Sequence, residues 1–418
     1  MILNQTKAFQ YGRLFYFWDM TSSNYILFDP EEVSNLLPLA YTKAVADFRI
    51  GIFTIKEKWN FYLKSSTQIL TRDYLQAKYE ALKFDGDCTY INNAVLPNHE
   101  VVKAINGLKP NQALFYKNDL IALKSNETIK SLNELYQLSK SIQKLEYNKA
   151  IDIIKHNWDI FTLNGNAILN DIQFVDYKEV NDKLEYALSA RNKKQIYFEE
   201  GAIVEACILD ASSGPIYIGK GAKVLDGAII KGPTAIGNNA VVKAGAKIYG
   251  ETTIGPHCKV GGEVSNAVIM GYSNKGHDGY LGNSVIGEWC NLGADTNTSN
   301  LKNNYSLVKS WNYSSKTYIN SNLQFCGLIM GDHSKSGINT MFNTATVVGV
   351  AANIYGGDFP PKFIPSFSWG GSSGFATFKL EKAFEMATNM MKRRGIEFTT
   401  LDKQILEYIF NEDAPFRN

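Results

Sequence analysis

The chain has 418 residues, enough for two or three domains with hydrophobic cores of their own. Its 43 basic and 41 acidic residues nearly cancel, which argues against electrostatic attraction to nucleic acid or to an anionic membrane. No apolar run approaches the roughly 18 residues of a membrane span. Five scattered cysteines without a C-x-x-C pair predict reduced thiols and a cytoplasmic location.

The first 19 residues carry no periodic pattern. Their longest apolar stretch, Leu14 to Trp18, is too short for the core of a signal peptide and is followed by Asp19. Met20 then precedes a polar segment and a strand-like run. We therefore expect residues 1–19 to be a disordered extension that adds nothing to the fold, with Met20 as the natural start.

Residues 20–165 contain few glycines and alternate strand-like with helix-like runs, which predicts an α/β domain with a sheet covered by helices. The predicted strands are Tyr25–Phe28, Ile50–Ile55, Thr89–Ile91 and Ala113–Phe115, and the predicted helices cover 56–66, Tyr74–Leu82, Asn98–Gly107 and Ile129–Leu145. Residues 166–200, with a further helix at Tyr177–Ala190, are predicted to connect this domain to the next.

An aliphatic residue recurs at every sixth position in the second half of the chain. The series runs through Ile218, Val224, Ile230, Ile236, Val242, Ile248, Ile254 and Val260. This period is typical of a left-handed parallel β-helix, in which three hexads complete one turn and the aliphatic side chains stack inside the coil. The coil is predicted to span residues 201–358.

The six-residue phase breaks twice, after Val260 and after Leu292, and excursions from a solenoid often carry binding loops. The second break, Ser299–Gln324, alternates aromatic and polar residues and predicts a projecting β-hairpin. Residues 359–418 begin with a Pro-rich loop and end in two helices. The second helix is predicted to start with a capping box formed by Thr399 and Asp402.

A polar motif follows the first break. Residues 275–282 read KGHDGYLG, and residues 286–300 read IGEWCNLGADTNTSN. This pattern resembles GlmU, the bifunctional N-acetylglucosamine-1-phosphate uridyltransferase/glucosamine-1-phosphate acetyltransferase, whose family shows G-H-x-x-Y-L-G-D and then I-G-x-x-x-N-I-G-A-G-T-x-x-x-N. The positions shared with the family are His277, Tyr280, Asn291 and Asn300, and Glu263 matches an acidic family position. The resemblance covers about residues 218–354.

The resemblance implies acyl transfer from acetyl-CoA, or another acyl-CoA, to an amine. His277 would be the general base, a role that suits the ordinary pKa of histidine. Glu263 would be the carboxylate that orients its ring. Tyr280, Asn291 and Asn300 would bind the sugar phosphate and the acyl group. The resemblance further implies a homotrimer with each site between neighbouring subunits.

The sequence allows two other interpretations of the role of His277. It could be an ordinary loop histidine, although the matched tyrosine and asparagines speak against this. It could also belong to a zinc site of the γ-carbonic-anhydrase type, which needs a close H-x-x-x-x-H pair that His257, His277 and His333 lack. The family's Arg and Lys around the sugar phosphate do not all match here, and Lys247, Lys259 and Lys275 are the replacement candidates. The acceptor sugar therefore stays open.

The N-terminal half has no L-A-A-G-x-G-T-R-M loop, the glycine-rich segment that wraps the triphosphate in sugar-phosphate nucleotidyltransferases. Residues 35–51, NLLPLAYTKAVADFRIG, resemble instead a divergent group of GlmU-like sugar nucleotidyltransferases with P-L-x-x-T-R-P-x-x-x-x-R-x-G, although Lys43 replaces the arginine and Ala44 the second proline. A Rossmann-like nucleotidyltransferase domain is implied.

Without the glycine loop, side chains must hold a triphosphate. Arg49 and Lys58 are the candidate phosphate ligands and Asp29 the candidate Mg²⁺ ligand. We expect these three residues to converge on one cleft at the carboxyl ends of the strands. A structural salt bridge of Asp47 with Arg49 or Lys58 is the competing interpretation.

Two functions therefore stand against each other. The first is a GlmU-like enzyme that acylates an amino-sugar phosphate or nucleotide sugar and transfers a nucleotide from a nucleoside triphosphate to a sugar 1-phosphate. The second is a non-catalytic nucleotide-sugar-binding or scaffolding protein with a degenerate N-terminal domain.

Overall fold

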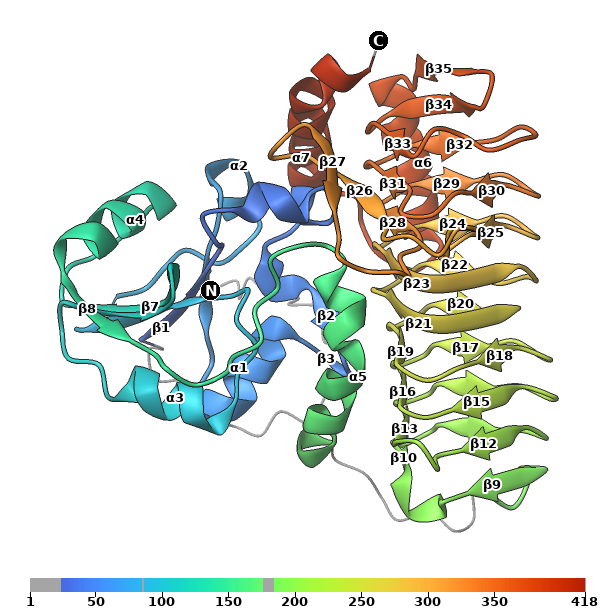
Figure 1. Ribbon diagram of the computed structural model, residues 1–418, viewed down its shortest axis with the longest axis horizontal. Coiled ribbons are helices and arrows are strands. Elements are labelled where there is room, and N and C mark those ends of the chain that lie inside the picture. Colours follow the sequence, from blue (N-terminus) through green and yellow to red (C-terminus); the bar gives the residue numbers. More distant parts are fainter. Residues whose placement is uncertain (1–23, 85, 176–183, 418) are drawn as a thin grey trace, which may run out of the picture.

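The computed structural model describes residues 24–84, 86–175 and 184–417. An α/β domain lies beside a tall β-helix, and the last C-terminal helix lies between their upper parts (Figure 1). The extension predicted at residues 1–19 and the first half of the helix predicted at Tyr177–Ala190 lie outside the described residues. The prediction of the second half of that helix is wrong, because residues 184–190 form a turn and the start of strand β9 (Ser189–Arg191). None of the helices seen in the described ranges is both long and apolar enough to cross a membrane.

The α/β domain is built on a mixed six-stranded sheet. Its strand order is β4 (Gln68–Leu70), β1 (Tyr25–Phe28), β5 (Cys88–Asn92), β7 (Asp119–Ser125), β6 (Gln112–Tyr116) and β8 (Gln143–Glu146). β4, β1 and β5 are parallel, whereas β7 runs antiparallel to both of its neighbours. The predicted strands of the N-terminal sheet at β1, β5 and β6 are confirmed.

Alternate side chains of the sheet enter two different cores, as the strand period of two requires. Phe28 packs on the face covered by α4 (Leu132–Ser141). Leu27 packs on the opposite face with Trp59 of α1 (Ile55–Leu63) and Val101 of α3 (His99–Asn106). The sheet is therefore covered by helices on both sides, as predicted.

Three predicted elements of this domain differ. The helix expected at Ile129–Leu145 is α4, which ends at Ser141, and the chain then enters strand β8. The strand expected at Ile50–Ile55 is a tight antiparallel pair, β2 (Arg49–Ile50) and β3 (Phe53–Thr54), which turns at Gly51 with φ +70°. Thr54 ends it and starts α1 through a capping box with Glu57. The helix expected at Tyr74–Leu82 is reduced to α2 (Asp73–Gln76).

The β-helix has three faces, which confirms the left-handed coil that the hexads predict. The strands of the first face are β10 (Ile196–Phe198), β13 (Ile216–Ile218), β16 (Thr234–Ile236), β19 (Thr252–Ile254), β28 (Ile329–Met330), β31 (Val347–Val348) and β33 (Phe363–Ile364). Ile218, Ile236 and Ile254 are in register and fully buried. The aliphatic residue of each hexad therefore stacks on its counterpart in the next coil.

The second and third faces complete each turn. The second face holds β11 (Ile203–Val204), β14 (Lys223–Val224), β17 (Val241–Val242), β20 (Lys259–Val260), β22 (Asn274–Lys275), β24 (Asn291–Leu292), β29 (Lys335–Ser336), β32 (Asn353–Ile354), β34 (Ser368–Gly371) and β35 (Gly374–Thr377). The third holds β9 (Ser189–Arg191), β12 (Ile208–Asp210), β15 (Ile229–Lys231) and β18 (Lys247–Ile248). Two long strands, β21 (Glu263–Ile269) and β23 (Tyr280–Ile286), pair with both the third and the first face.

The first phase break is a change in side length and not an excursion. After Val260 the next inward residue is Val264, four positions later, and the one after it is Ile269, five positions later. These steps are shorter than six because β21 turns a corner without leaving the coil. The second break is confirmed as a hairpin of β26 (Lys309–Asn312) and β27 (Thr317–Asn320). In the coil on either side of this hairpin in the sequence, β25 (Asn297–Thr298) pairs with β30 (Met341–Phe342).

The coil is longer than predicted at both ends. It begins at β9, within the segment 166–200 expected as a connector, and it continues past residue 358 through β33 and β34. Helix α5 (Asp159–Asp171) spans the predicted boundary of the α/β domain. The two predicted C-terminal helices, α6 (Leu380–Lys392) and α7 (Thr400–Glu412), are confirmed, as is the Thr399–Asp402 capping box.

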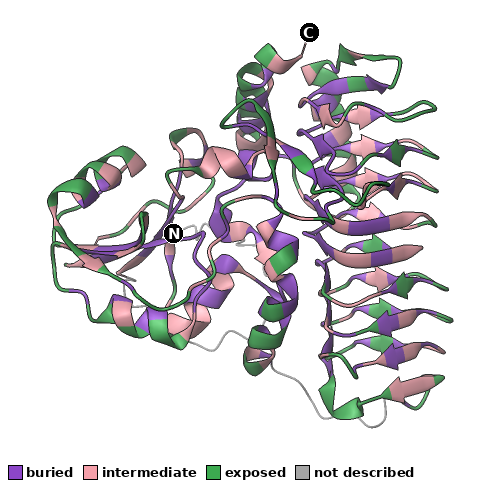
Figure 2. Cartoon of the chain, viewed as in Figure 1, coloured by how far each residue is buried: buried purple, intermediate pink, exposed green. Residues whose placement is uncertain are grey.

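The domains share one hydrophobic core. It contains Trp59 of the α/β domain, Trp289 of the coil and Ile405 of α7. Buried residues accordingly line the junction between the lobes as well as the inside of the coil (Figure 2). The positions of sites on the two lobes are therefore fixed relative to each other.

Candidate active sites

His277 lies at a corner of the coil, in the turn between β22 and β23, and its side chain is exposed. The corner backbone is packed tightly against the coils on either side. A Cβ at Gly262 would lie 2.6 Å from the Gly279 carbonyl oxygen, and Gly279 itself has φ +113°. The glycines let the corners stack closely, while the imidazole stays in contact with solvent.

Glu263 and Tyr280 lie side by side next to this corner. They are Cα partners in adjacent coils, and the Glu263 amide donates to the Gly279 carbonyl oxygen at 3.1 Å. Burial raises the pKa of Tyr280, and the charge of Glu263 acts in the same direction against a hydrogen bond from Asn300. No hydrogen bond of the described residues joins Glu263 to the His277 ring, so the orienting role of Glu263 stays a prediction.

Asn300 links Tyr280 to a residue that the sequence interpretation missed. Its Nδ2 donates to the Tyr280 hydroxyl at 3.0 Å and to Oδ1 of Asn283 at 2.7 Å. A Cβ at Gly282 would overlap the Tyr280 hydroxyl, which explains why glycine follows leucine in this motif. Asn283 has φ +47°, a conformation for which asparagine is enriched, but nothing in the sequence separates it from a turn residue.

Asn291 belongs to a polar column on the outside of the second face. Asn274, Asn291, Lys335 and Asn353 are Cα partners in successive coils. The Asn274 amide donates to Oδ1 of Asn291 at 3.5 Å, and the Lys335 ammonium bonds to the carbonyl oxygens of Trp289 and His333 at 2.9 and 2.7 Å. Asn291 thus faces outward on the second face, in the coil next to Asn274, which precedes the His277 corner.

The expectation that Lys275 faces the substrate is wrong. Lys275 is the Cα partner of Val260, an inward residue, and its side chain is only 2 % exposed. Its ammonium donates to the carbonyl oxygens of His277 and Asp278 at 2.7 and 3.0 Å. The reason is that the two inward steps in β21 are shorter than six residues. The next inward position therefore falls on Lys275, six residues after Ile269.

Asp29, the predicted Mg²⁺ ligand, is a buried structural acceptor at the end of β1. Oδ1 accepts from the Val45 amide and from Asn93 Nδ2, both at 2.9 Å. Oδ2 accepts from the Thr71 hydroxyl and from Arg72 Nε. Because both oxygens are already occupied, this carboxylate does not fit a metal site. Elsewhere in the described residues, no group of three His, Cys, Asp or Glu could hold a metal ion.

Arg49 and Lys58 do not meet Asp29 either. The Lys58 ammonium is buried and paired with Asp171 of α5, whose Oδ2 also accepts from the Ile52 amide. The Arg49 guanidinium donates to the Ile52 carbonyl oxygen. These cations therefore stabilise the turn at Gly51 rather than converge on a cleft with Asp29. The competing interpretation, a salt bridge of Asp47 with Arg49 or Lys58, is also wrong. Lys58 pairs with Asp171, and Asp47 accepts from the Tyr79 hydroxyl at 2.7 Å.

The motif that contains this turn forms the junction with the coil. Thr42 Oγ1 donates to Asp332 Oδ2 at 2.6 Å, and Lys43 Nζ lies 2.7 Å from Asp332 and 3.0 Å from Glu288. The Thr253 hydroxyl donates to the Gly51 carbonyl oxygen at 2.9 Å. Residues 38–54 thus contribute contacts to the interface between the α/β domain and the coil.

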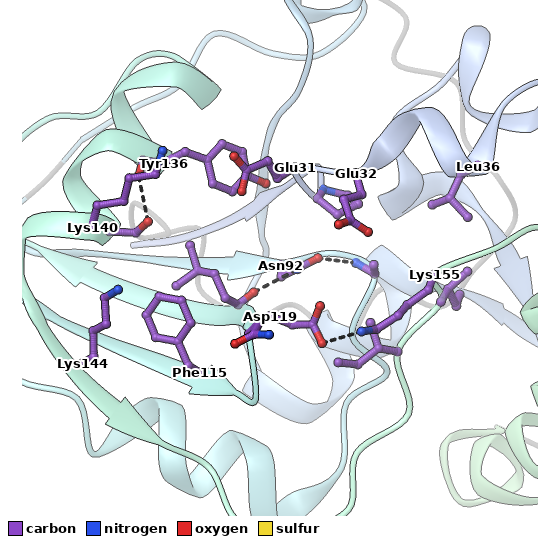
Figure 3. Close-up of a pocket in the computed structure, with 17 residues that line it drawn as sticks. Glu31, Glu32, Leu36, Asn92, Phe115, Asp119, Tyr136, Lys140, Lys144 and Lys155 are labelled. Carbon is purple, nitrogen blue, oxygen red and sulfur yellow. Dashed lines mark hydrogen bonds and ion pairs between the residues drawn. The ribbon is translucent and has the colours of Figure 1, made fainter. Parts of the chain in front are cut away.

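The α/β domain nevertheless has a pocket where open α/β sheets bind ligands, at the carboxyl ends of β1 and β5. It has a volume of about 250 Å³. Glu31 and Glu32, just after β1, line one side, and Asp119 and Lys155 lie opposite, joined by an ion pair of 2.6 Å (Figure 3). The pocket is also lined by Asn92, Tyr136, Lys140 and Lys144. Sequence reasoning missed it because its cations come from α4, β8 and the loop before α5.

Comparison with known proteins agrees with this architecture. Residues 25–179 match the family model described as sugar nucleotidyl transferase. The chain is 39 % identical over 87 residues to the bifunctional protein GlmU of Methanocaldococcus jannaschii. It is 38 % identical over 95 residues to a bifunctional sugar-1-phosphate nucleotidylyltransferase/acetyltransferase of Sulfurisphaera tokodaii.

The chain is similar to GlmU-like proteins in part of its length. Each match covers 21 % or 23 % of this chain and the same share of the curated relative, so the chain spans about a fifth of their length.

Among solved structures, an Arabidopsis UDP-N-acetylglucosamine acyltransferase is 17 % identical, with 52 % of this chain and 77 % of that chain covered and a TM-score of 0.22. AntD, an N-acyltransferase from Bacillus cereus crystallised with dTDP and 3-hydroxybutyryl-CoA, is 13 % identical, with 53 % and 100 % covered and a TM-score of 0.23.

Proposed function

We propose that the coil of this GlmU-like protein transfers an acyl group from acetyl-CoA, or another acyl-CoA, to the amine of an amino-sugar phosphate or nucleotide sugar. The proposal is carried by one observation. An exposed histidine stands at a corner of the coil, with Glu263, Tyr280 and Asn300 grouped after the corner and Asn291 facing outward on the preceding face.

The chemistry follows from the exposed imidazole. The amine attacks the thioester carbonyl, the new C–N bond forms, and Nδ1 or Nε2 of His277 accepts the proton that the amine loses. When the C–S bond breaks, the thiolate leaves and takes up that proton, so the base is regenerated. Tyr280 and Asn300, tied together by a hydrogen bond, would bind the sugar.

A homotrimer belongs to this proposal. The His277 corner faces solvent in a single chain, and a neighbouring coil would supply the second wall of a cleft that excludes water from the thioester. Cytoplasmic location, expected from the cysteines, stays a prediction; all five thiols are free and buried.

We further propose that the α/β domain transfers a nucleotide to a sugar 1-phosphate in the pocket at β1 and β5. Lys140, Lys144 and Lys155 would meet the phosphates there. Mg²⁺ normally binds one or two carboxylates together with the phosphates of the substrate, and Glu31 and Glu32 are exposed at the pocket rim. The metal would neutralise phosphate charge in transfer.

A scaffolding role of the α/β domain is the second candidate. It is favoured by the use of Asp29, Lys58 and the segment 38–54 for internal contacts and for the domain interface. In that case the pocket would hold a nucleotide sugar without reaction, or nothing.

Parallel assays separate these functions. Release of free thiol from acetyl-CoA is measured against a panel of amino-sugar phosphates and nucleotide sugars, and release of pyrophosphate from nucleoside triphosphates is measured with sugar 1-phosphates and Mg²⁺. We expect thiol release with at least one acceptor. Lys144→Ala and Lys155→Ala should reduce pyrophosphate release, with the surface variant Lys223→Ala as control. Absence of pyrophosphate release with every triphosphate would favour the scaffolding role.

A further inference from the structure

Lys275 is an exception inside the coil. The inner column of the second face contains Val224, Val242, Val260 and Leu292, all buried aliphatic residues. Between Val260 and Leu292 the column holds a lysine that is 2 % exposed. A charged side chain in a hydrophobic column costs stability unless its hydrogen bonds are made.

The lysine makes its hydrogen bonds to the corner that carries the candidate base. From inside the coil, Nζ donates to the carbonyl oxygens of His277 and Asp278, two and three residues further along. The side chain and backbone thereby close a ring around the turn. Burial lowers the pKa of Lys275 to about 8, while the charges of Asp278 and Asp295 oppose this shift.

The other hydrogen bonds of this corner hold the residues after His277, because the Asp278 carbonyl oxygen accepts from the Asp295 amide at 3.0 Å and the Gly279 carbonyl oxygen from the Glu263 amide at 3.1 Å. Among the described contacts, the His277 carbonyl oxygen accepts from Lys275 alone. Gly276 and Gly279 flank His277 and Asp278, and neither glycine has a side chain that could restrict the backbone. The imidazole of His277 makes no hydrogen bond among the described contacts. The direction of the ring therefore depends on the peptide groups that the lysine binds.

We infer that Lys275 is a positioning residue, which fixes the backbone of the His277 corner from inside the coil and so aims the imidazole at the acceptor amine. The inference rests on the proposed acyl transfer at this corner. It explains why the column contains a cation: a general base works only within hydrogen-bond reach of the proton that it removes, and a misplacement of about 1 Å can cost up to 100-fold in rate.

The inference predicts opposite changes in stability and in turnover. In Lys275→Met an aliphatic side chain of similar length completes the column, and replacement of buried charge by well-packed hydrophobic residues is often neutral or stabilising. We expect an unchanged or higher melting temperature, a kcat reduced about 10- to 100-fold, and a KM for acyl-CoA within about twofold. Lys275→Gln, which keeps an N–H donor, should give an intermediate kcat.

Lys335→Met is the matched control. Lys335 is on the same face, and its ammonium also bonds two carbonyl oxygens, but these belong to Trp289 and His333 at another corner. The kcat of this variant should stay within about twofold of wild type. A purely structural role of buried lysines would instead give both methionine variants the same small effect.

Amide hydrogen exchange of residues 276–279 separates this inference from the proposed function. In Lys275→Met these amides should exchange at least about tenfold faster than in wild type. Equal exchange and equal kcat in wild type and both Lys275 variants would overturn the inference. If Lys275→Met exchanged faster but wild type transferred no acyl group to any acceptor, the proposed function would fail and the aiming role with it, whereas the clamp itself would stand.

Discussion

Among single residues near the His277 corner, burial decides which side chains face the coil interior and which face the outer surface. Lys275 and Tyr280 both belong to the motif that resembles GlmU, yet one points into the coil and the other lies against the outer surface. Sequence spacing gave no sign of this difference, because the lysine stands where the regular hexad phase had already been lost.

The buried ammonium of Lys275 predicts a pH dependence of stability. Its pKa falls from the ordinary value of 10.5 to about 8 in the folded chain. The unfolded chain therefore binds more protons between these values, and wild type gains stability as pH rises from about 8 to about 10.5. Relative to Lys275→Met, the gain should reach about 3 kcal/mol. Urea unfolding of both proteins at pH 7.5 and pH 10 measures it, and a pH-independent difference between them would contradict the prediction.

Replacing Gly282 with alanine should impair acceptor binding without destabilising the fold. The Cβ of Gly282→Ala would overlap the Tyr280 hydroxyl and approach Asn300 Nδ2 at 2.8 Å, so the tyrosine must shift. We expect kcat/KM for the sugar acceptor to fall at least about tenfold, in line with the cost of misplacing a substrate-binding group, while the melting temperature changes little. Gly357→Ala, where an added Cβ meets nothing within 4 Å, is the control. Equal kinetics in the two variants would show that Tyr280 has no part in acceptor binding.

At the scale of elements, α5 joins the sheet domain to the coil through buried polar contacts. Asn164 Nδ2 donates to the Glu251 carbonyl oxygen at 2.8 Å, and its Oδ1 accepts from the Gly51 amide at 2.7 Å. About two turns further along α5, Asp171 binds Lys58 and the amides that follow Gly51. The helix thus holds the turn between β2 and β3 against the coil.

The Lys58–Asp171 pair yields a stability prediction. Lys58→Met leaves a buried carboxylate without its cation and should lower the free energy of unfolding by about 3–5 kcal/mol. The double variant Lys58→Met/Asp171→Asn should recover part of that loss. Urea unfolding of wild type, the single variant and the double variant tests this. A loss of nucleoside triphosphate binding by Lys58→Met without any loss of stability would restore its predicted role as a phosphate ligand.

The elements also show what the sequence could predict. The coil was predictable because eight hexads place one aliphatic residue inward at each step, and the pattern repeats without tertiary information. The hairpin of β26 and β27 and both C-terminal helices were predictable from local pattern for the same reason. The roles of Lys58 and Asp29 were not, because their partners Asp171 and Arg72 lie 113 and 43 residues away along the chain.

At the scale of the whole molecule, the two lobes behave as one body because their junction is both apolar and ionic. Lys43 is buried between Asp332 and Glu288, and their charges raise its pKa despite the desolvation that opposes this. Desolvation likewise opposes ionisation of Asp332, but Lys43 outweighs it and lowers that pKa. Between acid pH and pH 10 both groups therefore stay charged.

This junction predicts cooperative unfolding. Wild type should give a single calorimetric transition. Lys43→Met removes the cation from two carboxylates, one of them buried, at a cost of about 3–5 kcal/mol, and should split the melt into a less stable α/β domain and a more stable coil. Lys56→Met, a change in α1 away from the coil junction, should leave one transition. A single transition in Lys43→Met at an unchanged temperature would show that the ionic contacts do not couple the lobes.

The proposed role of His277 is that of the general base in acyl transfer. The most direct test is thiol release from acetyl-CoA by wild type and His277→Ala, with the acceptor that wild type uses best and with His99→Ala of α3 as the control histidine. Because the His277 side chain is exposed, its removal should leave the fold and the assembly unchanged and reduce kcat by about 10²–10⁴. A kcat of His277→Ala equal to that of wild type and His99→Ala would contradict the account.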